Sequence, residues 1–119
     1  MKENPVAEKS KAFALRIIGL YKYLCDEKHE FVMSKQILRS GTGIGANIRE
    51  GLRGQSKADF YAKLNISLKE ADETAYWLEL LHESNYITEA EFNSIYADNE
   101  ELIKLLVSIT KSQKFGLQQ

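Results

Sequence analysis

Six basic side chains between residues 34 and 66 are the residues of this chain best suited to binding phosphate groups. This stretch has only two acidic residues, Glu50 and Asp59, against Lys35, Arg39, Arg49, Arg53, Lys57 and Lys63. Arg and Lys make charge-assisted hydrogen bonds to phosphate oxygens, which position a nucleic acid without reading its sequence. On a continuous helix the first four fall within an arc of about 80°. The sequence therefore predicts a basic stripe that binds RNA or DNA.

Residues 67–103 carry the opposite charge, with ten acidic residues against Lys69. Such a separation can give one molecule a positive face and a negative face. The basic stripe therefore has two further interpretations. It is either an ordinary solvated helix face or a partner for the acidic helices of a neighbouring subunit. A protein–protein interaction scaffold with no nucleic-acid role is thus the alternative function.

Three glycines lie within one and a half turns of the same predicted helix, at Gly41, Gly43 and Gly45. Each costs about 1 kcal/mol relative to Ala in a helix interior. The segment matches the G-x-G-x-x-A form of the dinucleotide fingerprint, but that motif requires a preceding strand, and residues 33–38 look helical. We expect the glycines to serve close helix packing instead. The apolar side of this helix should hold Leu38, Gly41, Gly45, Ile48 and Leu52, with Ile37 and Ile44 at its edge.

The residues that could support catalysis are few. Glu79 and His82 have the Glu-x-x-His spacing of di-iron bundles, which need two such motifs and two further carboxylates. This chain has one, and its other histidine, His29, follows a polar connection. No Ser or Cys stands with a credible His and carboxylate for nucleophilic catalysis. We expect no enzymatic activity, no catalytic residue, no metal site and no cofactor.

Four amphipathic helices must position these side chains. Apolar residues at three- and four-residue spacing predict helices over about residues 5–26, 31–53, 57–84 and 89–115 of a single domain, 1–119. Asn4 is the expected N-cap of the first helix, and Thr88 with Glu91 forms the capping box of the fourth. Long amphipathic helices joined by short connections predict an all-α, antiparallel, up-down-up-down four-helix bundle.

The third predicted helix carries two apolar stripes. Its core line comprises Phe60, Leu64, Leu68, Ala71, Ala75 and Leu78. On the opposite side lie Ile66, Trp77 and Leu80. Trp is enriched in interface hot spots, and large exposed apolar patches are unusual in monomers. We therefore expect Ile66, Trp77 and Leu80 to form an oligomer interface with closed cyclic symmetry.

Composition indicates the compartment. No segment approaches the ~18 consecutive apolar residues of a membrane span. The only cysteine, Cys25, excludes an intramolecular disulfide and suits a reducing environment. We expect a cytoplasmic protein with no membrane partner.

Segments spread over nearly the whole chain share one further pattern, at residues 34–37, 39–40, 44–51, 56, 59–60, 64–71 and 85–88. Its most specific part is the element formed by Asn47, Glu50 and Gly51, together with Ser67 and Glu70. This pattern resembles the bacterial four-helix-bundle family encoded in intervening sequences of 23S ribosomal RNA. The chain departs from it in having Gly43 and Gly45, where relatives more often carry Ser or other residues, and Asn85, where Gly is usual. We expect Asn47, Glu50 and Glu70 to form hydrogen bonds across helices or subunits.

The resemblance implies a left-handed bundle that assembles into a ring, a homopentamer. It also implies kinship with the accessory proteins of diversity-generating retroelements, which bind nucleic acid and a reverse transcriptase through a basic surface. No enzymatic activity is implied. With the basic stripe, this predicts a non-enzymatic oligomeric protein whose partners are copies of itself, RNA or DNA, and a reverse transcriptase.

Overall fold

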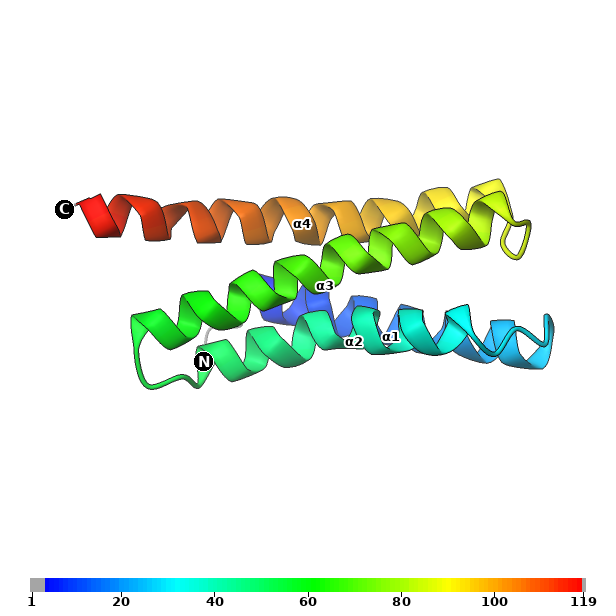
Figure 1. Cartoon of the computed structure of the whole chain (residues 1–119), viewed down its shortest axis with the longest axis horizontal. Helices are drawn as coiled ribbons and strands as arrows, with labels where there is room; N and C mark the ends of the chain where they lie inside the picture. The colour runs from blue at the N-terminus through cyan, green and yellow to red at the C-terminus, as the bar shows by residue number, and fades with distance from the viewer. Residues whose placement is uncertain (1–3, 119) are drawn as a thin grey trace.

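Four helices account for the regular structure of the part of the chain that the computed structural model describes, residues 4–118, with side chains described to residue 112. They are α1 (Pro5–Asp26), α2 (Met33–Leu52), α3 (Lys57–Glu83) and α4 (Glu89–Gln118). The helices lie lengthwise in a molecule of 51 × 25 × 24 Å, and successive connections lie at alternate ends (Figure 1). Packing contacts join α1 to α2, α2 to α3, α3 to α4 and α4 to α1. The expected all-α four-helix bundle is therefore present.

Local capping sets the starts of α1 and α4 at the expected residues. The Asn4 side chain accepts hydrogen bonds from the N–H groups of Val6 and Ala7, at 3.1 and 3.3 Å. At α4, the Thr88 N–H donates to the Glu91 carboxylate at 2.8 Å, and the Glu91 N–H donates to Thr88 Oγ1 at 3.1 Å. These caps satisfy backbone donors that have no partner within the first turn of a helix.

The start of α2 differs from the expected residue 31, because a side chain outside the helix caps it. Glu30 is only 8% exposed, and its carboxylate accepts hydrogen bonds from the N–H groups of Val32, Met33 and Ser34 at 3.2, 3.1 and 2.8 Å. Phe31 and Val32 therefore lie before the helix and remain exposed. The expected boundaries of 31–53 are corrected to Met33–Leu52.

The buried line of α2 is also rotated from the one expected. Ile37 and Ile44 are fully buried and central, whereas Leu38 is half-buried and Leu52 is 43% exposed. The cause is that Ser34 and Ser40 occupy core positions. A prediction that counts only apolar residues does not assign these serines to the core, so it places the buried side of the helix at the wrong angle.

Buried hydroxyl groups join α2 to α3. Ser67 Oγ donates to the Ile44 carbonyl oxygen at 2.8 Å, and Thr74 Oγ1 lies 2.8 Å from Ser40 Oγ. On α3, Leu64, Ala71 and Leu78 are fully buried, as expected, and Ser67 and Thr74 share their line. The expected members Phe60, Leu68 and Ala75 are half-buried beside it. The interface of α2 with α3 is thus partly polar, and each of these hydroxyl groups has a partner.

Two glycines bring α1 and α2 together. A Cβ added at Gly41 would lie 2.7 Å from Cγ1 of the buried Ile17. A Cβ added at Gly45 would lie 3.2 Å from Ser10 Oγ and 3.4 Å from the Ser10 carbonyl oxygen. At Gly41 the facing helix occupies the space of a side chain, and at Gly45 a side chain would require Ser10 to shift by a few tenths of an ångström. The predicted role of these glycines in close helix packing agrees with this geometry.

No helix within residues 4–118 combines the length and apolar character needed to cross a membrane.

Candidate nucleic-acid interface

The basic side chains of α2 lie on its outer surface, but they face different neighbouring helices. Lys35, Arg39 and Arg49 are exposed on α2, and Arg53 is exposed at the C-cap that follows it. Lys57 is exposed at the start of α3, and Lys63 is half-buried further along the same helix. Arg39 faces α3, whereas Arg49 faces α1. The predicted cations therefore do not form one continuous stripe.

Arg39 belongs to an ion-pair network with α3. One guanidinium nitrogen lies 3.4 Å from Glu70 Oε2, and the other contacts Glu73 Oε2. The same Glu73 oxygen accepts a hydrogen bond from Trp77 Nε1 at 2.9 Å. Two carboxylates thus offset the charge of Arg39 within the chain.

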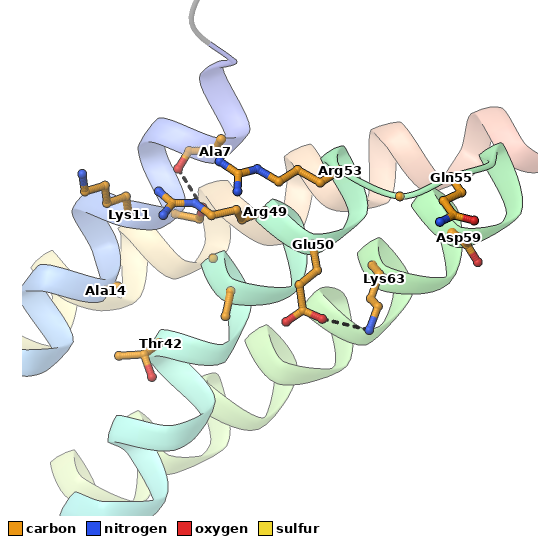
Figure 2. A pocket seen from close by; sticks show the side chains of 14 residues that line it. Ala7, Lys11, Ala14, Thr42, Arg49, Glu50, Arg53, Gln55, Asp59 and Lys63 are labelled. Carbon is orange, nitrogen blue, oxygen red and sulfur yellow. Dashed lines mark hydrogen bonds and ion pairs between the residues drawn. The ribbon is translucent and has the colours of Figure 1, made fainter.

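A second group lines a groove of about 820 Å³ between α1, α2 and the start of α3. Its cations are Lys11 from α1, Arg49 from α2, Arg53 from the C-cap of α2, and Lys63 from α3. Figure 2 shows Lys11, Arg49 and Arg53 on the α1 side of the groove, while the Glu50–Lys63 ion pair lies between α2 and α3. Small side chains form the floor of the groove: Ala7, Ser10, Ala14, Thr42 and Ala46.

Three of these cations have no intramolecular partner. Among residues 4–112, the side chains of Lys11, Arg49 and Arg53 form no hydrogen bond or ion pair. The carboxylates that line the groove are Glu50, which pairs with Lys63, and Asp59. Both lie toward α3, so the α1 side of the groove is a concentration of unpaired positive charge.

The remaining predicted cations lie elsewhere. Lys35 precedes Arg49 by 14 residues on α2, a rise of about 21 Å at 1.5 Å per residue. Neither Lys35 nor Lys57 lines the groove. Of the six predicted residues, the structure thus brings together Arg49, Arg53 and Lys63.

Lys11 is the site residue that sequence reasoning missed. It belongs to a different helix from the predicted stripe, and nothing in its local pattern marks it as part of a basic site. One signal was present. Ala7 and Ala14 lie one turn before and after Lys11, and small residues there match the close approach of α1 to α2 at Gly45.

The residues of the family pattern lie mostly between α2 and α3. Glu50 pairs with Lys63 at 3.0 Å, and Glu70 pairs with Arg39, so both carboxylates act across helices as expected. Asn47 does not, since its Nδ2 donates to the Gly43 carbonyl oxygen of its own helix at 2.9 Å. Within the described residues its side chain therefore bonds to its own helix, and the expected bond across subunits stays a prediction. Gly51 is buried, and a Cβ added there would lie 3.0 Å from Leu64 Cδ1.

The three residues predicted as an oligomer interface differ in exposure. Ile66 is 41% exposed. Trp77 and Leu80 are half-buried, and Trp77 packs against the core of its own chain. Tyr76, which is 55% exposed, contacts the Trp77 ring edge-on with centroids 5.4 Å apart. An interface on α3 would therefore present Ile66 and Tyr76 more fully than Trp77.

The residues of the Glu-x-x-His motif pack against α4. His82 stacks on Phe92 with ring centroids 4.4 Å apart, and the Tyr96 hydroxyl donates to Glu79 Oε2 at 2.7 Å. That hydrogen bond, followed by burial, raises the pKa of Tyr96 to about 12. Within the described part of the chain, no three His, Cys, Asp or Glu side chains are grouped to hold a metal ion.

The fold and groove define a small four-helix-bundle protein with a cationic groove between its first two helices. The sequence model of the 23S rRNA-intervening sequence protein family matches residues 2–108, and the chain belongs to this family. It is 62% identical to a crystal structure from Bacteroides thetaiotaomicron, described as a protein of unknown function from the S23 ribosomal protein family. That alignment covers 89% of this chain and 98% of the other, with a TM-score of 0.88. No curated protein matches.

Proposed function

We propose that this protein is a non-enzymatic, oligomeric, cytoplasmic protein that binds RNA or DNA through the phosphate backbone. The observation that carries the proposal is the groove in which Lys11, Arg49 and Arg53 have no partner among the described residues. Cations that are not offset by carboxylates displace the counterions condensed around nucleic-acid phosphates, and this displacement is the main source of sequence-independent affinity.

The lining of the groove favours contact with the backbone over contact with bases. Within the described part of the chain no aromatic residue lines it, so bases have no ring on which to stack there. Its small floor residues let a strand approach the helices closely. We therefore expect binding with a steep dependence on salt and little preference for sequence.

Fewer cations are needed for this proposal than the six predicted from the sequence. Arg39 and Lys63 are each offset by carboxylates, so they contribute less than a free cation does. Lys35 and Lys57 are exposed but lie outside the groove. Phosphate contacts are therefore assigned mainly to Lys11, Arg49 and Arg53.

The test compares two charge-reversed variants that carry the same change in net charge. Arg49→Glu/Arg53→Glu alters the groove, whereas Lys22→Glu/Lys104→Glu alters exposed cations outside it. Fluorescence anisotropy with labelled RNA and DNA strands at two salt concentrations gives the affinities. We expect the groove variant to bind at least tenfold more weakly and to show a shallower salt slope, by roughly one for each phosphate that is no longer neutralised. Equal affinities of the two variants, or no binding by the unaltered protein at low salt, would overturn the proposal.

The proposal includes assembly into a ring of identical subunits, a homopentamer of antiparallel, up-down-up-down bundles. Connections at alternate ends of the bundle support the helix order (Figure 1). Exposed apolar side chains at Ile66 and Tyr76 support an interface on α3 that includes the half-buried Trp77 and Leu80. Exposed apolar side chains that gather into a large patch are usually covered by another protein surface.

Light scattering on Ile66→Asp, with Leu15→Asp as the control, tests the interface. Leu15 is 62% exposed on α1, so both changes replace an exposed apolar residue with an acid. We expect Ile66→Asp to dissociate the assembly and Leu15→Asp to leave it intact. The reverse result would move the interface to α1, and a monomeric unaltered protein would exclude the ring.

The second candidate function is a protein–protein interaction scaffold. It is favoured by the way cations of α2 already pair with acids of α3, through Arg39 with Glu70 and Glu73. The same chemistry between subunits, or toward a reverse transcriptase, would use the basic surface without nucleic acid. In that case the assembly should dissociate as salt rises, while RNA affinity stays negligible at every salt concentration.

A further inference from the structure

We propose that the groove holds the phosphate monoester at the end of a nucleic-acid strand, and not a run of internal phosphates. This inference rests on the proposed function and names the chemical group that the groove recognises. Its basis is that Lys11 from α1 and Arg49 and Arg53 from the facing end of α2 line the same side of the groove, with no partner among the described residues (Figure 2).

The three cations can reach a single group. Arg49 and Arg53 are one helical turn apart, so their Cβ atoms are separated by about 5–6 Å and their long side chains can meet at one point. Lys11 lines the same side of the groove from α1, and its long side chain is exposed and free to turn toward the two arginines. A guanidinium group presents paired donors that match two phosphate oxygens, and an ammonium group supplies three more donors. A phosphate monoester offers three terminal oxygens to these donors, whereas an internal phosphodiester offers two.

The charge of the cluster matches a terminal phosphate. A phosphate monoester carries about −1.5 to −2 at pH 7 and has three strong acceptor oxygens. An internal phosphodiester carries a single negative charge. Three unpaired cations within one cluster therefore favour the strand end over any internal position.

The remainder of the groove offers little to the next phosphate. Its floor continues along uncharged side chains, Ala14, Thr42 and Ala46. On the α3 side, Glu50 and Asp59 present carboxylates, and the nearby Lys63 is already paired. A strand lying along the groove would thus meet one strong cationic position followed by neutral or acidic ones.

The experiment measures the affinity of the full-length protein for one RNA sequence in four forms: with a 5′-phosphate, with a 3′-phosphate, with hydroxyl groups at both ends, and as a closed circle. We expect a strand with a terminal phosphate to bind about tenfold more tightly than the hydroxyl form. The circle, which has no end, should bind as weakly as the hydroxyl form. Lys11→Ala should reduce the preference for the phosphorylated strand to near one, whereas Lys22→Ala, on the same helix but outside the groove, should preserve it.

The outcomes separate this inference from the proposed function. If all four RNA forms bind equally while Arg49→Glu/Arg53→Glu still loses affinity, the terminal-phosphate assignment is overturned and the nucleic-acid proposal stands. If no RNA form binds, both fail. Inorganic phosphate and a nucleoside monophosphate serve as competitors. If these competitors displace the phosphorylated strand only at concentrations far above the Kd of that strand, the result supports a strand end as the ligand. If they displace it at concentrations close to that Kd, the assignment is overturned in favour of a small phosphate ester.

Discussion

The Nζ atom of Lys63 on α3 lies 3.0 Å from Oε1 of Glu50 on α2, at the edge of the cationic groove. The Lys63 side chain is 38% exposed and the Glu50 side chain 58%, so solvent screens the pair and it contributes about 0–1 kcal/mol to stability. Its effect on charge is larger than its effect on stability, because it removes one cation from the groove and places a carboxylate there.

Glu50→Gln should therefore strengthen RNA binding. Loss of the carboxylate releases Lys63 and lowers the repulsion of phosphates, so we expect affinity at low salt to rise about three- to tenfold. The free energy of unfolding should change by less than about 1 kcal/mol. Anisotropy and chemical denaturation measure the two effects. Glu101→Gln is the control, since it breaks the exposed pair with Lys9 at 3.0 Å outside the groove. A rise of equal size in both variants, or a fall with Glu50→Gln, would contradict this account of the pair.

Alanine at two helical glycines should have opposite effects on stability. At Gly41 the new Cβ would lie 2.7 Å from the fully buried Ile17, so we expect Gly41→Ala to destabilise the protein by about 1–3 kcal/mol. At Gly19 no atom of the described residues facing it lies within 4 Å of the new Cβ. Gly19→Ala should stabilise α1 by about 0.5–1 kcal/mol through helix propensity. Urea denaturation of both variants checks the signs, and a stabilising Gly41→Ala would show that α1 and α2 separate at little cost.

The cap formed by Glu30 should be important to stability. Removing its carboxylate in Glu30→Ala leaves three N–H groups at the start of α2 without their partner. We expect a loss of about 1–2 kcal/mol, the size typical of a helix N-cap. Glu100→Ala removes an exposed carboxylate from α4 and should change stability by less than about 0.5 kcal/mol. Equal losses in thermal or urea denaturation would mean that the Glu30 contacts add nothing to the fold.

Tyr96 should be the last tyrosine to ionise as the pH is raised. Its hydrogen bond to Glu79, together with burial, raises its pKa to about 12 from a reference of 10.0. Since the pKa in the folded state is the higher one, the stabilisation is fully present below pH 10 and is lost as pH rises through 12. Ultraviolet titration of tyrosinate should show one late-titrating group that Tyr96→Phe removes. At neutral pH this variant should lose about 1 kcal/mol of unfolding free energy. Unchanged titration of Tyr96→Phe would assign the late group to another residue.

The helices could be predicted where their signals are local. Asn4 and Thr88 cap helices through side chains within three residues of their partners, so short sequence patterns located those starts. The start of α2 depends on a carboxylate folded back from the connection, which has no such pattern. The core face of α2 was displaced because Ser34 and Ser40 are buried, and only the hydroxyl groups facing them from α3 explain why.

The types of residue in the candidate site could be predicted from the sequence, but the contacts that each of them makes could not. Sequence pattern identified Arg39, Arg49 and Arg53 as cations on one helix. It could not separate Arg39 from the others, because its carboxylates lie 31 and 34 residues away in the chain. Nor could it add Lys11, whose place in the groove depends on how closely α1 packs against α2.

The contact between Gly45 and Ser10 has an evolutionary consequence. Lys11 adjoins Ser10, and Arg49 follows Gly45 by one turn. The distance between the two cations therefore depends on a glycine that lies away from the charged groups. A Cβ at this position would lie 3.2 Å from Ser10 Oγ, so Ser10 would have to shift by a few tenths of an ångström. A change of one nucleotide turns a glycine codon into an alanine codon. Selection could thus alter the width of the groove, and with it the ligand, while every cation that lines it stays the same.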